Sequence, residues 1–221
     1  MTTAKINAAK AAFEYVENGM CIGLGSGSTV REFIKLLGEK VRGKELGVCC
    51  VTTSLESRAL AIEEKIWVTE PDAIEKIDLA VDGADKVTKK ALLKGGGGAL
   101  TREKIIDYNA KKFIVIVDEG KVMEEPIEGK VSLEVLQFAV PFVMKRLKDF
   151  EPKIRMAKMK LGPVVSDNGS LILDCRMKLE NPEKTERELD AIPGVIENGI
   201  FTKFDEIIVG SEKGSRRLIE K

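Results

Sequence analysis

Short apolar runs alternate with helix-like segments along the first half of the chain. The run at 113–117 is continuously apolar, which is typical of a parallel strand covered on both faces. Residues 4–16 place small and apolar side chains at helical spacing, and further helices are expected after Thr29, over 53–64 and from Thr101. The other predicted strands are 20–22, a run ending at 50–53, 67–68 and 77–81. Strands that alternate with helices predict an α/β fold with a mostly parallel, Rossmann-like sheet and helices on both faces.

The pattern changes from about residue 127. We expect a long helix over 133–147, a charged strand near 153–159, a hairpin whose turn is Asp167-Asn168-Gly169, and a helix over 182–189. The apolar run 206–210 then returns to complete the sheet. The predicted organisation is a larger domain of residues 1–126 and 201–221, with a smaller inserted α+β lobe of residues 127–200.

Composition narrows the class of partner. The 221 residues include 36 basic and 36 acidic side chains, so the net charge is zero and any anion site is local. This balance argues against nucleic acid or a membrane surface as the main partner. No apolar run reaches membrane-spanning length, and the first residues do not resemble a signal segment. Four cysteines without zinc-site spacing indicate reduced thiols, so we expect a cytoplasmic protein.

Histidine is absent from the chain. The commonest general base and metal ligand is therefore missing, and acid–base chemistry near neutral pH falls to carboxylates, lysine, tyrosine or thiols. The sequence disfavours a metal hydrolase, and we expect no metal site.

A glycine-rich segment follows the first predicted strand. Gly23-Leu24-Gly25-Ser26-Gly27-Ser28-Thr29 lies between a strand and a helix, an arrangement that directs backbone amides at a phosphate. It is not a P-loop, and Ser28 replaces the third glycine of a dinucleotide fingerprint. The hydroxyls of Ser26, Ser28 and Thr29, beside the free backbone of Gly27, suit the terminal phosphate of a small sugar. Alternatively, Thr29 only caps the helix, with Glu32 completing a capping box.

The stretch 81–104 concentrates acids, a lysine and backbone freedom. Asp82-Gly83-Ala84-Asp85 follows a buried strand, and Lys94 precedes the glycine run 95–98. Glu103 lies in the first turn of a helix that we expect Thr101 to cap. Each feature has an ordinary structural reading, as a turn, a mobile loop or a carboxylate at a helix dipole. Together they predict a site at the carboxyl end of the sheet, where α/β proteins form ligand crevices.

DGAD followed by KGGGGALTREK closely resembles the A-type ribose-5-phosphate isomerases, and the likeness extends over nearly the whole chain. The resemblance implies that Glu103 is the base that moves a carbon proton, and that Asp82 and Asp85 handle hydroxyl protons and ring opening. Lys94 would stabilise the oxyanion. Further implied substrate contacts are Ser26, Gly27, Ser28, Thr29, Gly83, Ala84, Gly95, Gly96, Gly97 and Lys121. The family implies no metal or organic cofactor, a small sugar phosphate as ligand, and a homodimer or homotetramer.

Two other functions remain open at this level. A sugar-phosphate-sensing effector domain would keep the phosphate loop but need no base, although the chain shows no DNA-binding segment or basic patch. An acyl-CoA transferase would use Glu103 as a covalent nucleophile.

Overall fold

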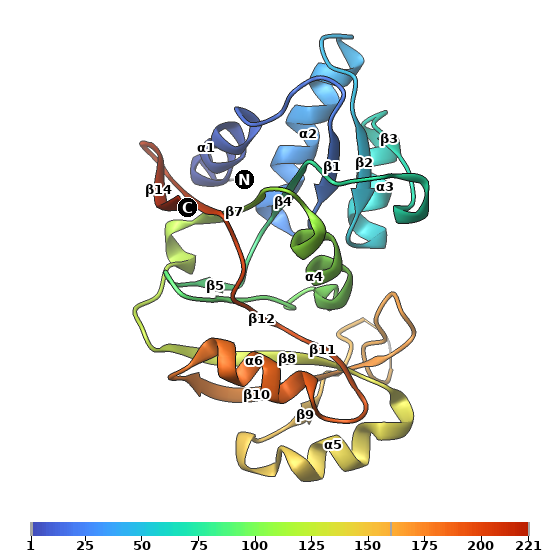
Figure 1. Ribbon diagram of the computed structural model, residues 1–221, viewed down its shortest axis with the longest axis vertical. Coiled ribbons are helices and arrows are strands. Elements are labelled where there is room, and N and C mark those ends of the chain that lie inside the picture. Colours follow the sequence, from blue (N-terminus) through green and yellow to red (C-terminus); the bar gives the residue numbers. More distant parts are fainter. Residues whose placement is uncertain (1, 160, 221) are drawn as a thin grey trace. The chain divides into compact units, whose positions relative to one another are not determined.

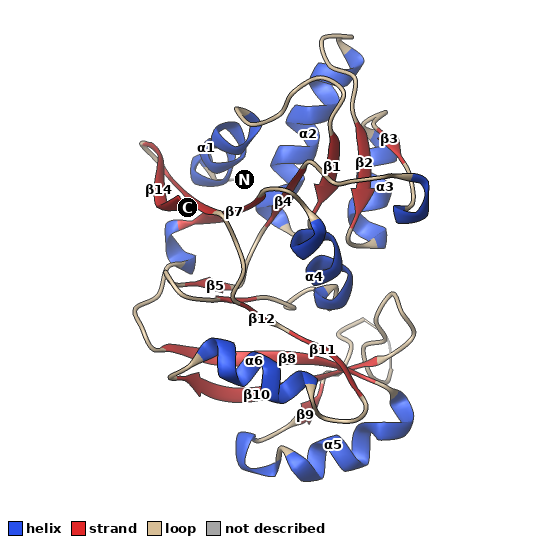
Figure 2. Cartoon of the chain, viewed as in Figure 1, coloured by secondary structure: helices blue, strands red, loops and turns tan. Residues whose placement is uncertain are grey.

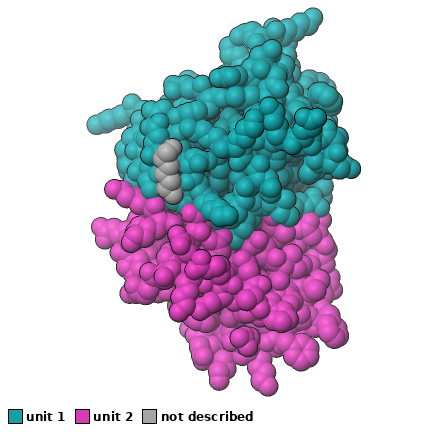
Figure 3. All heavy atoms as spheres, in the orientation of Figure 1, with its two compact units in different colours: residues 1–84, 102–122, 203–221 teal, residues 85–101, 123–202 magenta. Residues whose placement is uncertain are grey.

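The computed structural model describes residues 2–159 and 161–220, which divide into two compact units (Figure 3). Unit 1 comprises the chain up to Ala84, Arg102–Val122 and the chain from Lys203 onward. Unit 2 comprises Asp85–Thr101 and Met123–Thr202. Residues 85–101, which the sequence analysis placed in the larger domain, therefore group with unit 2.

Unit 1 is built on a seven-stranded sheet with the order β14-β13-β7-β4-β1-β2-β3 (Figures 1 and 2). All neighbouring pairs are parallel except β13 and β14. The strands are β1 (Cys21–Leu24), β2 (Cys49–Thr52), β3 (Trp67–Val68), β4 (Leu79–Asp82), β7 (Phe113–Asp118), β13 (Glu206–Ser211) and β14 (Gly214–Glu220). The expected return strand is confirmed, whereas β14 was not predicted.

The chain extends the sheet in opposite directions from β1 and β4: β2 and β3 follow on the side of β1, whereas β7 and β13 follow on the side of β4. Leu24 of β1 is the register partner of Val81 of β4, so the segments that follow these two strands start side by side. In an open α/β sheet, this topological switch point is where ligands bind, at the carboxyl ends of the strands. The glycine-rich segment and the Asp82-Gly83-Ala84 turn both lie there.

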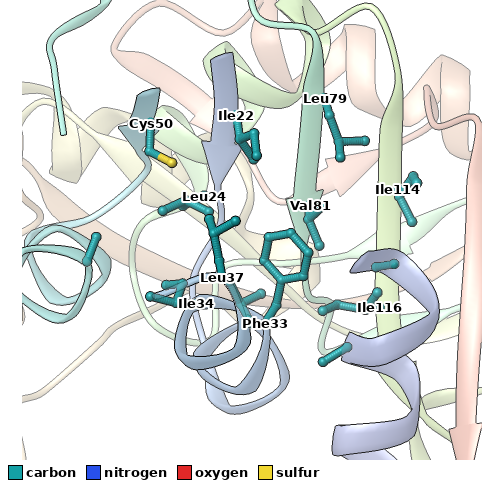
Figure 4. Packing of buried hydrophobic residues seen from close by; sticks show 14 of the residues in the cluster. Ile22, Leu24, Phe33, Ile34, Leu37, Cys50, Leu79, Val81, Ile114 and Ile116 are labelled. Atoms are coloured by element: carbon teal, nitrogen blue, oxygen red, sulfur yellow. The ribbon is translucent and has the colours of Figure 1, made fainter. Parts of the chain in front are cut away.

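Helices cover both faces of this sheet. On one face, α1 (Thr3–Phe13) and α2 (Ser28–Arg42) pack in a core cluster (Figure 4). Labelled members of this cluster are Ile22, Leu24, Phe33, Ile34, Leu37, Cys50, Leu79, Val81, Ile114 and Ile116. On the other face, Ile106 of α4 (Leu100–Asn109) packs with Val51 and Ile77. Gly23 permits this approach, because a Cβ there would lie 2.5 Å from Ile106 Cγ2. The predicted Rossmann-like α/β fold is confirmed.

The remaining helices of unit 1 are short. They are α3 (Leu55–Glu63) and the 3₁₀ helices η1 (Pro71–Ala73) and η2 (Glu119–Lys121). α3 has a capping box formed by Ser54 and Ser57. Among the described residues, no helix has the length and apolar character needed to cross a membrane.

Unit 2 contains two small sheets, ordered β11-β8-β10-β9 and β12-β6-β5. The strands are β5 (Lys86–Val87), β6 (Leu92–Leu93), β8 (Ile127–Val135), β9 (Lys153–Ile154), β10 (Leu171–Leu179), β11 (Val195–Asn198) and β12 (Ile200–Phe201). The helices are η3 (Gln137–Ala139), α5 (Val140–Arg146), η4 (Lys148–Phe150) and α6 (Pro182–Asp190). Their apolar side chains form a separate core around Val131, Leu133 and Leu173.

The long helix predicted over 133–147 is wrong. Its first residues belong to β8, which pairs with β10 through nine successive residues, and only Val140–Arg146 is α-helical. The apolar residues Val131, Leu133 and Val135 alternate with polar ones, and this period of two is the pattern of a strand. The charged strand is also shorter than expected, since β9 covers only Lys153–Ile154.

The predicted turn at Asp167-Asn168-Gly169 is confirmed. Ser166 N–H donates to Ser170 O at 2.8 Å, and Gly169 adopts φ +81°. Val165 forms an isolated antiparallel bridge with Leu171, the first residue of β10. The hairpin is therefore present, with one very short arm.

Candidate active site

The glycine-rich segment leads directly into α2. The helix starts at Ser28, and its N-cap is Gly27, which adopts φ +101° and offers no side-chain cap. The capping alternative for Thr29 is therefore wrong, because Thr29 is already the second helical residue. Without a capping side chain, the first-turn amides of α2 form the type of helix N-terminus that binds phosphate.

Hydroxyl groups and one lysine surround this loop. Ser26 Oγ lies 2.9 Å from Thr53 Oγ1 and donates to Ser54 Oγ at 2.8 Å. Lys5 Nζ donates to Ser28 Oγ at 2.9 Å, which places a cation at the exposed start of α2. The sequence leaves open whether Lys5 joins the phosphate site, because nothing in the local pattern shows that α1 meets this loop.

Asp82 links the two loops at the switch point. It is fully buried at the end of β4, and its Oδ1 accepts the amides of Ser26 at 2.9 Å and Gly83 at 2.6 Å. Gly25 makes this possible, since a Cβ there would lie 2.0 Å from Asp82 Oδ1. Gly83 and Ala84, both partly exposed, continue from the same strand end.

Glu103 lies in the first turn of α4 and is 5% exposed. Because α4 connects the parallel strands β4 and β7, its N-terminus faces the carboxyl ends of the strands. The predicted cap at Thr101 is wrong: α4 begins at Leu100, and the Thr101 hydroxyl instead donates to the buried Glu134 carboxylate. Lys121 ends η2, directly after β7 on the same sheet edge, and is partly buried.

The other predicted residues belong to unit 2. Asp85 Oδ2 accepts the amide of Gly96 at 2.7 Å, and a Cβ on Gly96 would lie 2.4 Å from Asp85 Oδ1. Lys94 is 3% exposed, and its amide donates to Gly199 O at 2.8 Å. Its Nζ lies 5.4 Å from the centroid of the Phe201 ring, a cation–π contact.

An arginine absent from the sequence prediction contacts the glycine run. Arg155 Nη1 donates to Gly95 O at 2.7 Å and to Gly96 O at 3.1 Å. Its Nε donates to Asp174 Oδ2 at 2.9 Å. Burial acts to raise the pKa of Asp174, but the hydrogen bond and charge of Arg155, together with Lys130 and Ser132, outweigh it, so this pKa lies below its usual range. Arg155 and Asp174 are far apart in the sequence, and only strand pairing brings them together.

The predicted site residues thus form two groups. The sheet-edge group, on unit 1, comprises Ser26, Gly27, Ser28, Thr29, Asp82, Gly83, Ala84, Glu103 and Lys121. The glycine-loop group, on unit 2, comprises Asp85, Lys94, Gly95, Gly96 and Gly97. Within the described residues, no cluster of three or more histidine, cysteine, aspartate or glutamate side chains is suited to hold a metal ion. Both groups combine carboxylates with hydrogen-bond donors, which suits proton transfer on a phosphorylated polyol.

Comparison with known proteins identifies the family. Residues 49–214 match the family described as ribose 5-phosphate isomerase A (phosphoriboisomerase A). The ribose-5-phosphate isomerase A of Methanococcus aeolicus is 49% identical over 93% of this chain and 90% of its own length. The structure of ribose 5-phosphate isomerase A from Methanocaldococcus jannaschii superposes with a TM-score of 0.94 at 42% identity, covering 98% of both chains. A D-ribose-5-phosphate isomerase in complex with phospho-erythronic acid gives the same TM-score at 44% identity and the same coverage. This chain therefore belongs to the ribose 5-phosphate isomerase A family.

Proposed function

We propose that this enzyme interconverts D-ribose 5-phosphate and D-ribulose 5-phosphate through an enediolate, as a step of the non-oxidative pentose phosphate pathway. Membership of the isomerase family supports this reaction. The main structural support is the hydrogen bond from the amide of Ser26 to Asp82. It joins the glycine-rich loop, whose type binds phosphate, to a buried carboxylate at the switch point.

The sheet-edge group supplies the phosphate site in this proposal. Ser26, Gly27, Ser28 and Thr29 contribute hydroxyls and amides at the start of α2, and Lys5 and Lys121 add positive charge. The hydrogen bond between Lys5 and Ser28 supports a role for Lys5. A phosphate here would meet both a helix N-terminus and cations, which are the usual partners of a bound phosphate.

Glu103 acts as the base in the proposed mechanism. It takes the C2 proton of the open-chain aldose, and the electron pair of the C–H bond forms the C1–C2 double bond while negative charge develops on O1. Protonation of O1, loss of the O2 proton and return of the carbon proton to C1 then create the carbonyl at C2. Burial of Glu103 supports this role, because a carboxylate that is 5% exposed is held in place and shielded from bulk water.

Asp82 and Asp85 handle the hydroxyl protons and ring opening, with Gly83 and Ala84 contacting the sugar. Lys94 and the backbone of Gly95, Gly96 and Gly97 stabilise the developing oxyanion. In this structure the amide of Gly96 donates to Asp85, so it also orients that carboxylate. The reaction assigned to these residues needs no metal or organic cofactor.

The sensing domain and the acyl-CoA transferase are not favoured, because the chain belongs to an isomerase family. The discriminating experiment is incubation of the EDTA-treated protein with ribose 5-phosphate in D₂O, followed by proton NMR. Formation of ribulose 5-phosphate with deuterium at the transferred position is expected for an enediolate. Ligand-induced stabilisation without product would indicate a sensing domain, and an acyl adduct on Glu103 would indicate a transferase.

We further propose that the chain forms a homodimer or homotetramer. Unit 2 exposes large apolar side chains around η3 and α5, among them Phe138 (88% exposed) and Phe142 (67% exposed). Their rings lie 6.4 Å apart between centroids, which makes a contiguous apolar surface of the kind found at protein interfaces. Sedimentation of Phe138→Glu should show a smaller species than the parent. Trp67→Glu serves as the control, because it places the same charge at an exposed apolar residue of unit 1, outside this surface.

A cytoplasmic location is also proposed. All four cysteines are free thiols, and burial together with Cys49 raises the pKa of Cys21 to about 12. Such thiols are typical of a reducing compartment. Thiol titration of freshly purified, denatured protein should therefore find four free thiols.

A further inference from the structure

The glycine run must be held in one conformation if its amides are to serve the reaction. Gly95 adopts φ +101° and Gly98 φ +80°, and the amide of Gly98 closes a turn onto Gly95 O at 3.0 Å. Consecutive glycines lose more conformational freedom on ordering than any other residues. A turn bond alone leaves the peptide planes between Gly95 and Gly97 to be fixed by other groups.

Arg155 is placed to fix them. Besides the two carbonyls, its guanidinium holds both oxygens of Asp174, and its Nη2 donates to Ser132 Oγ at 2.7 Å. Ser132 Oγ in turn donates to Asp174 Oδ1 at 3.0 Å. The Arg155 side chain is only 12% exposed. A guanidinium held by a two-pronged ion pair is a rigid support, because its donors form a planar fork.

The planarity of the peptide bond links the carbonyls to the amides. In a trans peptide, the C=O of Gly95 points opposite to the N–H of Gly96, and the C=O of Gly96 opposite to the N–H of Gly97. Arg155 therefore directs both N–H groups away from itself. The Gly96 N–H, so directed, reaches Asp85 Oδ2 at 2.7 Å.

We propose that Arg155 is a positioning residue for the isomerisation: by holding the carbonyls of Gly95 and Gly96, it orients the amides of Gly96 and Gly97 and, through Gly96, the carboxylate of Asp85. This role rests on the proposed function of the glycine-loop group. The positive charge on the carbonyl side also polarises each peptide, which strengthens its N–H as a donor.

The test compares the kinetics of Arg155→Ala and Arg155→Lys with those of the parent. Misplaced catalytic groups lower turnover, so kcat should fall about 10- to 100-fold while KM changes less than about threefold. Lysine should not restore the rate, because one ammonium cannot hold two carbonyls and a carboxylate together. Millimolar guanidinium, well below denaturing concentrations, should raise kcat of Arg155→Ala by filling the vacated position. Arg176→Ala, an exposed arginine on the same strand as Asp174, is the matched control and should keep parent kinetics.

A merely structural role predicts a different result. It would lower the melting temperature and the fraction of active protein, without a guanidinium response in the folded variant. That outcome, or parent-like kcat in Arg155→Ala or in Arg155→Lys, would overturn the proposal. If Arg155→Ala does not fold, Arg155→Lys decides between the two results. Asp85→Asn separates this proposal from the proposed function. Full activity in Asp85→Asn would refute the catalytic role of the glycine-loop group. Loss of activity in Asp85→Asn, with parent-like kinetics in the Arg155 variants, would refute only the role of Arg155.

Discussion

The carboxylate of Asp82 accepts the backbone amide of Ser26 at 2.9 Å, which ties the end of β4 to the loop that follows β1. These residues are 56 positions apart in the sequence. Parallel pairing of β1 with β4 brings them together, and the absence of a side chain at Gly25 leaves room for the carboxylate. The glycine-rich loop and a candidate catalytic acid are thus joined by one hydrogen bond.

Gly25→Ala should damage the site without a change at any ionisable residue. The new methyl group would lie 2.0 Å from Asp82 Oδ1, so the carboxylate or the loop must move. We expect kcat/KM to fall about 100-fold, the scale set by displacing a catalytic group by about 1 Å. Steady-state kinetics against Gly43→Ala, at the exposed C-cap of α2 with an ordinary φ of −69°, provides the comparison. Unchanged kinetics in Gly25→Ala would show that the position of Asp82 is unimportant.

Glu103→Gln should abolish most turnover and leave binding nearly intact. The amide has the shape of the carboxylate but cannot accept the carbon proton, so kcat should fall by about 10²- to 10⁴-fold. Calorimetric titration with phospho-erythronic acid, the ligand in the complex of a relative, would measure binding separately. Glu63→Gln, on the exposed end of α3, serves as the control. Parent-like kcat in Glu103→Gln would contradict the assignment of the base.

Ser28→Ala and Thr29→Ala should act mainly on KM. Each removes a hydroxyl proposed to bind the phosphate, and a hydrogen bond to a charged group contributes about 1.5–3 kcal/mol. The corresponding rise in KM is about 10- to 100-fold, with kcat within about threefold of the parent. Varying ribose 5-phosphate in a coupled assay separates the two constants. A fall in kcat at unchanged KM would contradict this assignment and would show that these hydroxyls act in the chemical step instead of in phosphate binding.

Glu206→Gln should destabilise unit 1 in a pH-dependent way. Glu206 is fully buried and accepts Tyr15 Oη at 3.0 Å and Arg217 Nε at 2.6 Å, with Lys112 Nζ at 3.3 Å. Burial acts to raise the pKa of Glu206, but Tyr15, Arg217 and Lys112 outweigh it and lower the pKa. A lowered folded-state pKa gives stability that is complete above the unfolded pKa and is lost as the pH falls through the folded pKa.

We therefore expect Glu206→Gln to lose about 2 kcal/mol at neutral pH, or roughly 4–8 °C in melting temperature. The difference from the parent should start to shrink as the pH falls below about 4, near the unfolded pKa, and should vanish once the pH passes the lowered folded pKa. Thermal melts across pH would measure both effects. Glu220→Gln removes an exposed partner of the same Arg217, at 3.5 Å, and should change the melting temperature little. An equal loss at all pH values would indicate a packing defect instead of a charge effect.

The sequence located the large sheet and most candidate residues because both have local signatures. Continuous apolar runs such as 113–117 identify doubly covered strands, and glycines beside acids at strand ends identify a site in an α/β fold. Local patterns were less reliable in unit 2, where the helix predicted over 133–147 begins within the strand that contains Leu133-Glu134-Val135. Its pairing partner in β10 lies about forty residues later, and pairing between distant strands overrides local preference.

The sequence by itself determined the family, the fold class and the residue types available for chemistry, since these follow from local motifs and from the absence of histidine. Only the tertiary structure decided which residues contact and position the candidate site residues. Lys5 on Ser28, Asp82 on Ser26, and Arg155 on the carbonyls of Gly95 and Gly96 each join segments that lie far apart in the chain. Hydrogen bonds of this kind depend on distance and direction in space, which strand register and side-chain packing fix and which no local spacing encodes.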